Sequence, residues 1–243
     1  MENNKNFSLK KFNYNYKDHY EKRSKLFLDA FPDTIGQPVA SLDHYLWKFH
    51  TYPNYPNSYE YSLFKDHNLV GYYSALPIEY SIKGKTHHIA LVCDVMTSTK
   101  IRREGLFTKL SISSLKDLAQ NNLDFTLGYP IEEYVMKAHK KVGWSNHFNL
   151  PLYFKLLRFD HLLKKIHLGY LSVLFNLPLK FFTFVVDKIY FRNLEFKVEK
   201  HELKSFLLLK DLDNFMQTFN SHHIITLNKN KKFLNWRFQM PGK

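Results

Sequence analysis

The sequence predicts an α/β fold of three layers, in which helices flank a central, mixed and mostly antiparallel β-sheet. Stretches with helical spacing of apolar residues alternate with short apolar stretches that are typical of strands. Five of the eight glycines lie between residues 71 and 143, where they separate short elements by tight turns. With 44% apolar residues, the 243-residue chain can bury a sizeable core, so disorder is not expected.

The expected elements alternate strands and helices. Loose alternation of apolar and polar residues predicts the first strand, and apolar residues near helical spacing, followed by Pro32, predict the first helix. Polar turns at 65–68 and 83–85 join three consecutive strands, the second of which alternates like a half-buried antiparallel strand. In order, the elements are strand 7–16, helices 17–31 and 43–49, strands 59–64, 69–82 and 89–96, helix 106–120, strand 124–127, helix 131–142 and strand 152–158.

The stretch 89–96 is the expected centre of the sheet because it is apolar apart from Asp94. Helix 106–120 follows it with its apolar residues on one face, and helix 131–142 ends before Gly143, a residue that commonly terminates helices. This order of elements predicts a mixed sheet between two helical layers.

Three domains are expected along the chain. Residues 1–160 form the main domain, 161–195 a helical apolar connector, and 196–243 the start of a second, incomplete domain of the same fold. Within the connector, the stretch 169–191 predicts a buried or interfacial helix pair broken near Pro178, because charges and proline interrupt it too often for a spanning helix.

A weak internal repeat is the reason for expecting a second copy. Leu46-Trp47-Lys48-Phe49 resembles Asn235-Trp236-Arg237-Phe238, and a helix-like stretch precedes each segment. Coincidence is the alternative, since short aromatic matches are common in a chain with 22 phenylalanines.

The net charge of +13 suggests a polyanionic partner, such as nucleic acid, an anionic membrane or a phosphorylated cofactor. A solvated basic surface explains the charge equally well, and basic runs as short as 229–232 do not favour nucleic acid. The apolar stretch 169–191, flanked by basic residues, keeps a peripheral membrane contact as the alternative.

Cys93 is the only cysteine, which excludes disulfides within the chain and argues against a zinc site built on cysteine. The histidine pairs at 87–88 and 222–223 are adjacent and project in different directions, so no metal site is predicted. Residues 1–11 are polar and lack the apolar core of a signal peptide, which favours the cytoplasm.

The most informative segment joins strand 89–96 to helix 106–120. A buried strand ends, a basic loop with Arg102 and Arg103 follows, and Gly105 precedes the helix. A helix N-terminus offers unpaired backbone N–H groups and the positive end of the helix dipole, so main chain alone can hold a diphosphate there. Glycine allows close backbone approach. An ordinary strand-to-helix turn is the alternative interpretation.

This segment resembles the acetyl-CoA-binding motif of the GNAT acetyltransferases, Arg/Gln-x-x-Gly-x-Gly/Ala, and here it is Arg102-Arg103-Glu104-Gly105-Leu106-Phe107. Phe107 departs from the small residue of the pattern. The order of elements from Phe7 to Arg158 matches the family's topology, and Gly143-Trp144 after helix 131–142 resembles the end of its fourth helix. The Trp-Lys/Arg-Phe segments are similar to those of tandem-domain bacterial members.

The resemblance implies a GNAT acyl-CoA N-acyltransferase fold and an enzyme of the EC 2.3.1 class. Such an enzyme passes an acetyl or other acyl group from acetyl-CoA, its co-substrate, to a primary amine such as an amino sugar or another small-molecule amine. No metal is implied. A non-catalytic CoA-binding or regulatory relative and a basic polyanion- or membrane-binding protein stay open, and the sequence gives no information on the oligomeric state.

The resemblance also implies where acetyl-CoA binds. In this family the strand before the loop and the strand after the next helix splay apart, and pantetheine pairs with the exposed strand edge. Main-chain contacts are therefore expected at Val95, Met96 and Thr97, with a backbone N–H of Val95 or Met96 contacting the carbonyl oxygen. The diphosphate is expected on the backbone of Arg102, Arg103, Glu104, Gly105, Leu106, Phe107 and Thr108.

Asp94 is the expected general base because it is the only charge in an apolar strand, where burial would raise its pKa. A carboxylate that caps the following loop is the alternative. The resemblance places the family's frequent tyrosine acid near His139, which is the expected donor to the thiolate, with Tyr134 as the second candidate. A packing or surface histidine is the alternative for His139.

Overall fold

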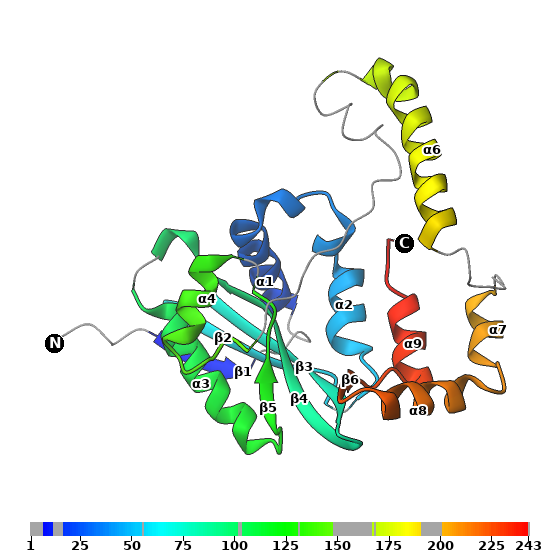
Figure 1. Cartoon of the computed structure of the whole chain (residues 1–243). Coiled ribbons are helices and arrows are strands. Elements are labelled where there is room, and N and C mark those ends of the chain that lie inside the picture. The colour runs from blue at the N-terminus through cyan, green and yellow to red at the C-terminus, as the bar shows by residue number, and fades with distance from the viewer. Residues whose placement is uncertain are drawn as a thin grey trace. The chain divides into compact units, whose positions relative to one another are not determined.

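A computed structural model describes residues 7–11, 17–54, 56–101, 104–130, 132–147, 167, 169–190 and 201–242. The chain forms two units, one made of residues 1–145 and 201–243 and the other of residues 146–200. The first unit contains the sheet and most of the helices, and the second contains α6 (Figure 1).

The sheet has six strands among the described residues, in the order β1-β2-β3-β4-β5, with β6 also paired to β3. All neighbours are antiparallel except β4 and β5. Strand β3 is long enough to pair with β2 over residues 68–75 and with β6 over residues 80–82. The strands are β1 Phe7–Lys11, β2 Tyr59–Lys65, β3 Asn68–Ile82, β4 Lys85–Thr97, β5 Phe125–Leu127 and β6 Ile225–Leu227. The predicted mixed, mostly antiparallel sheet is confirmed.

Two-residue turns join the three central strands. Asp66 and His67 have φ of 48° and 65°, and Lys83 and Gly84 have φ of 49° and 76°. Positive φ at both central residues gives a turn whose twist matches that of the flanking strands. Both turns lie where the sequence predicted them.

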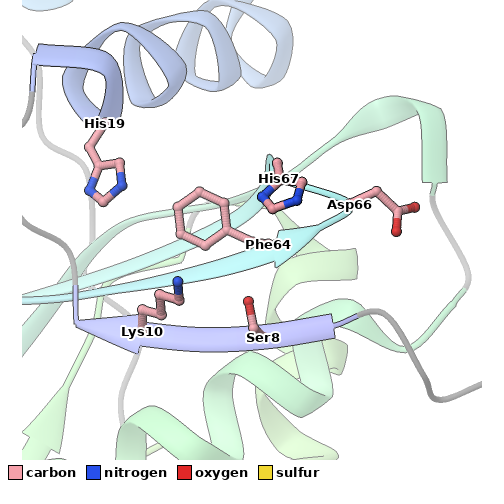
Figure 2. A pocket seen from close by; sticks show the side chains of 6 residues that line it. All are labelled: Ser8, Lys10, His19, Phe64, Asp66 and His67. Atoms are coloured by element: carbon pink, nitrogen blue, oxygen red, sulfur yellow. The ribbon is translucent and has the colours of Figure 1, made fainter.

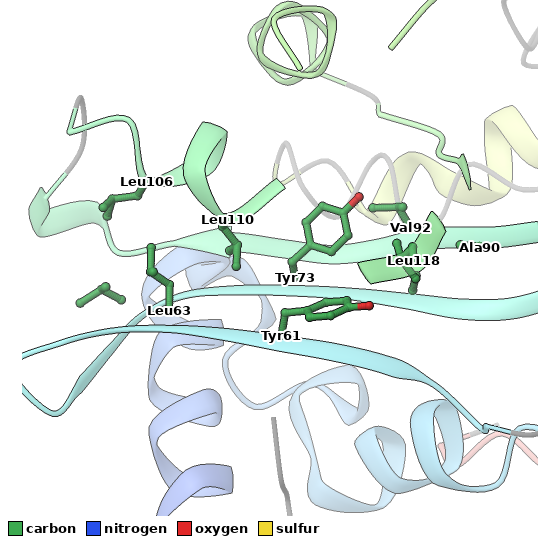
Figure 3. Packing of buried hydrophobic residues seen from close by; sticks show 10 residues of the cluster. Tyr61, Leu63, Tyr73, Ala90, Val92, Leu106, Leu110 and Leu118 are labelled. Carbon is green, nitrogen blue, oxygen red and sulfur yellow. The ribbon is translucent and has the colours of Figure 1, made fainter. Parts of the chain in front are cut away.

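Helices cover both faces of the sheet. On one face, α3 buries Leu106, Leu110 and Leu118 against the tyrosines and aliphatic residues of β2, β3 and β4 (Figure 3). On the other face, α1 buries Leu26 and Phe27, and α2 contributes a cluster of aromatic residues. The helices of this unit are α1 Lys17–Ala30, α2 Leu42–His50, α3 Leu106–Gln120, α4 Glu133–Lys140, α7 Leu203–Leu207, α8 Leu212–His222 and α9 Lys231–Phe238. The three predicted layers are therefore present.

The second unit differs from the prediction. A short 3₁₀ turn, Gly169–Leu171, precedes α6, which runs without interruption from Ser172 to Tyr190. The predicted break near Pro178 is wrong because proline removes only one hydrogen bond, and this 19-residue helix continues across it. Among the described residues, no helix combines the length and apolar character that crossing a bilayer requires.

Other predictions fall outside what the structure tests. The predicted strand 152–158 lies outside the described residues. The domain boundaries at 160 and 195 stay predictions, as does the start of a second domain in 196–243. Within 201–242, β6 extends the sheet and α9 packs against the aromatic cluster of α2.

Candidate active site

Strand β5 pairs with only part of β4. They pair in parallel only from Ile89–Leu91 to Phe125–Leu127. Beyond Leu91, β4 continues to Thr97 and, among the described residues, it pairs there with β3 alone. Residues 92–97 thus present main-chain groups along an edge that β5, which ends at Leu127, does not cover.

A β-bulge directs the Asp94 side chain. Tyr72 is opposite Met96 and Ser74 is opposite Cys93, so two residues of β4, Asp94 and Val95, lie opposite one residue of β3. Asp94 has φ of 48°, which lies in the left-handed region. The extra residue places Cys93 and Asp94 on the α1/α2 face and Val95 on the α3 face. The bulge therefore turns the only carboxylate of the strand toward the α1/α2 face, beside the open edge.

Two cations hold Asp94. Lys48 Nζ of α2 lies 2.7 Å from Oδ1, and Arg23 Nη2 of α1 lies 3.1 Å from Oδ2. The side chains of Asp94 and Lys48 are about one-fifth exposed, while that of Arg23 is 4% exposed. The carboxylate is therefore held from two helices at once and is largely shielded from solvent.

The predicted rise in the pKa of Asp94 is wrong. Burial alone would raise this pKa, but the charges of Lys48 and Arg23, together with the Lys48 hydrogen bond, outweigh burial and lower it. Burial on its own would lower the pKa of Lys48, but the neighbouring Cys93 and Asp94 outweigh burial and raise this pKa above its usual value. Both partners stay charged at neutral pH, so Asp94 is an ionised hydrogen-bond acceptor with low proton affinity.

Aromatic rings surround the Arg23 guanidinium. Its carbon lies 4.6 Å from the centroid of Tyr45, 4.9 Å from that of Phe27 and 5.3 Å from that of Tyr72. Buried Glu60 accepts hydrogen bonds from the hydroxyls of Tyr45 and Tyr72. These contacts fix the guanidinium in place, so Arg23 reaches Asp94 with little freedom to move.

The loop after β4 is anchored before it reaches α3. Asp29 at the end of α1 accepts hydrogen bonds from the Thr99 N–H (3.0 Å) and the Thr99 hydroxyl (2.7 Å). Gly105 is the N-cap of α3 with φ of 70°, a conformation that favours glycine. The first hydrogen bond of α3 runs from the Lys109 N–H to the Gly105 carbonyl oxygen. The backbone N–H groups of the residues before Lys109 have no acceptor within the helix, as at any helix N-terminus.

Other residues of the predicted diphosphate site have different surroundings. Arg102 and Arg103 lie outside the described residues. Glu104 is exposed and pairs with Lys65 at 3.2 Å. Phe107, which departs from the family motif, packs edge-to-face on His139 with centroids 5.0 Å apart.

Residues 15–146, more than half of the chain, match the family model of the acetyltransferase (GNAT) domain. The chain belongs to the GNAT acetyltransferase family. The family description makes it an acyltransferase. The matched range contains α1 to α4 and β2 to β5, and therefore every element of the site described above.

Solved structures are similar to this chain at low sequence identity, and those with TM-scores of 0.50 and 0.51 share the GNAT fold. An aminoglycoside acetyltransferase from an uncultured soil metagenomic sample, in complex with trehalose, has 13% identity and a TM-score of 0.51 over 64% of this chain and 99% of that chain. An aminoglycoside N-acetyltransferase in complex with CoA has 14% identity and a TM-score of 0.50 over 64% and 98%. A probable N-acyltransferase from Enterococcus faecalis V583 has 17% identity and a TM-score of 0.45 over 54% of this chain and 31% of that chain. No curated protein matches.

The candidate proton donors of the GNAT domain lie in different environments. His139 is 7% exposed, its Nδ1 lies 2.9 Å from the Val135 carbonyl oxygen, and its ring also packs edge-to-face on Trp144 at 4.8 Å. The carbonyl accepts, so Nδ1 carries the hydrogen and only the doubly protonated ring can donate from Nε2. Tyr134 is 73% exposed. The structure therefore brings His139 beside Phe107 and leaves Tyr134 on the surface.

Trp144 lies at the point where β4 and β5 separate. A side chain at Gly128, the residue after β5, would come within 3.1 Å of the Trp144 ring and 3.9 Å of the Val92 carbonyl oxygen. Glu133, in the first turn of α4, pairs with Lys137 at 2.8 Å. The rings of Phe107, His139 and Trp144 thus form a continuous row from the start of α3 to Gly128 at the end of β5.

Sequence reasoning missed Arg23 and Lys48. A signal for Arg23 was present, because Tyr20, Arg23 and Phe27 are three and four residues apart and place a cation on the apolar face of α1. Lys48 belongs to the repeated Trp-Lys/Arg-Phe segment. Nothing in the local sequence of either residue indicates Asp94 as the partner.

A cavity of about 310 Å³ is lined by residues other than Asp94, its two cations and His139. Figure 2 shows its lining from β1, α1, β2 and the β2–β3 turn, namely Ser8, Lys10, His19, Phe64, Asp66 and His67. None of them was a predicted site residue. In the part of the chain that the structure describes, no group of three or more His, Cys, Asp or Glu side chains is placed to hold a metal ion.

Proposed function

We propose that this GNAT protein is an N-acetyltransferase that passes the acetyl group of acetyl-CoA to a primary amine of a small molecule, such as an amino sugar. The observation that supports this most is the juxtaposition of the open β4 edge with Asp94, which the bulge turns toward the α1/α2 face. The open edge of β4 can then receive the thioester, while the α1/α2 face of the same strand presents a fixed carboxylate to the amine.

In this proposal acetyl-CoA lies along β4 and α3. Pantetheine pairs with the main chain of Val95, Met96 and Thr97, and the diphosphate lies at the N–H groups that open α3 after Gly105. Arg102 and Arg103 add positive charge from the preceding loop. The aminoglycoside N-acetyltransferase solved with CoA supports this co-substrate, because it shares the fold.

Asp94 acts on the amine side. Its carboxylate stays ionised beside Lys48 and Arg23, so it binds and orients the amine, whose proton leaves through solvent. The nitrogen lone pair attacks the thioester carbonyl carbon, and a backbone N–H of Val95 or Met96 contacts the oxygen that becomes negative. The carbon–sulfur bond then breaks and the CoA thiolate takes a proton, for which His139 is the proposed donor and Tyr134 the second candidate.

The test measures CoA release from acetyl-CoA over a panel of amines, together with calorimetric titration of acetyl-CoA. Gly105→Glu is the matched control, because it places a side chain in a left-handed conformation and a negative charge beside the diphosphate. The wild-type protein is expected to bind and turn over, and the variant to bind at least ten-fold more weakly. Absence of acetyl-CoA binding by folded wild-type protein would overturn the proposal.

A non-catalytic CoA-binding protein is the second candidate. The packing of His139 between Phe107 and Trp144, and the exposure of Tyr134, favour it because one side chain is enclosed by rings and the other lies on the surface. It predicts acetyl-CoA binding without turnover on any amine of the panel. Turnover that is lost in Asp94→Ala would exclude it.

A further inference from the structure

Two tryptophans join the C-terminal segment to α2. The rings of Trp47 and Trp236 are stacked, with centroids 4.6 Å apart and an interplanar angle of 4°. The Trp47 indole N–H donates to the Trp236 carbonyl at 2.8 Å, and the Trp236 indole N–H donates to the Trp47 carbonyl at 2.9 Å. Both residues are more than 90% buried. The contact is therefore reciprocal, with each residue serving as donor and acceptor for the other.

This contact completes the end of α2. The last carbonyls of a helix lack intrahelical donors and need partners from elsewhere. The Thr51 N–H bonds to Leu46, so the Trp47 carbonyl accepts from the Trp236 indole and the Thr51 hydroxyl instead. Without Trp236, a buried carbonyl in the last turn of α2 would lose one of its partners, and the stacked ring would lose its support.

The next residue of the same turn is Lys48, which is bonded to Asp94 at 2.7 Å. Any shift of this turn of α2 moves the base of the lysine side chain. Hydrogen bonding and charge interactions of this kind depend steeply on distance in a shielded site. The orientation of α2 therefore controls whether Lys48 keeps its contact with the carboxylate.

We propose that Trp236 is a positioning residue of the acetyl-transfer site, which holds the end of α2 through Trp47 so that Lys48 stays on Asp94. The inference rests on the proposed acetyl transfer. It adds a part of the chain to the site, because Trp236 lies beyond the residues 15–146 that match the family domain. The segment is held in register by β6 on β3 and by Asn228, whose side chain donates to Glu79 at 3.0 Å.

The experiment compares Trp236→Leu, Trp236→Phe and Leu234→Ala in the full chain. Leu234 is a buried residue of the same helix, so Leu234→Ala matches the loss of packing without touching the indole contact. We expect kcat to fall about ten-fold in Trp236→Leu with the KM for acetyl-CoA unchanged, since misplacement by about 1 Å can cost up to ~10² in rate. Trp236→Phe keeps the stacking and is expected to recover part of the rate, whereas Leu234→Ala is expected to keep the wild-type kcat.

Two further measurements separate positioning from a general loss of structure. A double-mutant cycle with Lys48→Met is expected to be non-additive, because Trp236 acts through Lys48. Titration of the carbon-13-labelled Asp94 carboxyl by NMR is expected to give a higher pKa in Trp236→Leu than in wild type, which needs no substrate. An additive cycle, or an Asp94 titration equal in the two proteins, would overturn the proposal. A wild type without turnover but with this NMR difference would overturn only the acetyl transfer.

Discussion

Helices α2 and α9 are built alike but end in different surroundings. Each begins after a side-chain cap, since Ser41 Oγ accepts from the His44 N–H at 3.1 Å and Asn230 Oδ1 accepts from the Phe233 N–H at 2.9 Å. In both helices the tryptophan is the sixth residue after the cap and a cation follows it. The shared pattern gives two short, capped helices whose indoles stack on each other.

The cations after the two tryptophans have different partners. Lys48 reaches a carboxylate that a bulged strand directs toward it, whereas Arg237 is exposed, with its guanidinium carbon 5.9 Å from the Trp47 ring centroid and Nη1 3.2 Å from Met240 Sδ. The same local sequence thus gives an ion pair in one place and a surface contact in the other. The strand opposite the helix, not the helix itself, decides which of the two forms.

The largest effect is expected when the carboxylate is removed. Asp94→Ala leaves two shielded cations without their partner, and breaking such a group typically costs about 3–5 kcal/mol. Acetyl transfer should be lost at the same time. Urea unfolding of the purified variant and the CoA-release assay measure the two effects. A variant as stable as wild type would show that the ion pairs contribute little.

Replacing the two cations one at a time tests the comparison directly. Lys48→Met is expected to lower the free energy of unfolding by about 2 kcal/mol, because it removes a hydrogen bond between charged groups. Arg237→Met is expected to change it by about 0.5 kcal/mol or less, as is usual for an exposed side chain. Equal effects in urea unfolding would contradict the difference between the two helices.

The pH dependence of stability should follow Asp94. Its pKa is lower in the folded protein than in the unfolded chain, where about 3.9 is usual. The contribution is therefore fully present above that value and is lost as pH falls through the folded pKa. Urea midpoints of wild type and Asp94→Asn should differ by a constant amount between pH 5 and 8 and converge below about pH 4. A difference that does not shrink as pH falls below about 4 would mean that the pKa of Asp94 is not lowered.

Smaller effects than that of Lys48→Met are expected from the two caps. Ser41→Ala and Asn230→Ala should each cost about 1 kcal/mol of stability, which is typical for a side-chain N-cap. Only Ser41→Ala changes the start of the helix that contains Lys48. Thermal unfolding measures the stability of both variants. The ratio of their kcat values shows whether loss of the α2 cap lowers activity more than loss of the α9 cap.

Much of the fold could be predicted because its signals are local. The bounds of α3 agree with the predicted helix 106–120, and both hairpin turns lie at the predicted polar residues. The prediction failed at Pro178 because the loss of one hydrogen bond at a proline does not interrupt a helix of 19 residues. Strand 152–158 and the start of a second domain stay predictions.

The site was predicted only in part because its decisive contacts are not local. The sequence indicated the loop, Gly105 and Asp94 itself. The bulge has no glycine to mark it, and the partners of Asp94 lie 46 and 71 residues away along the chain. The sign of the pKa shift follows from these partners, so burial alone gave the wrong direction.

The length of β3 has a consequence for how the molecule folds. Its first half and the β3–β4 hairpin can form from neighbouring segments, but β6 must return from the far end of the chain to reach residues 80–82. Closing a long loop is slow because its entropy must be lost before the contacts form. We therefore expect a nearly complete sheet to wait for its last strand, and the two indoles to meet only at the end of folding.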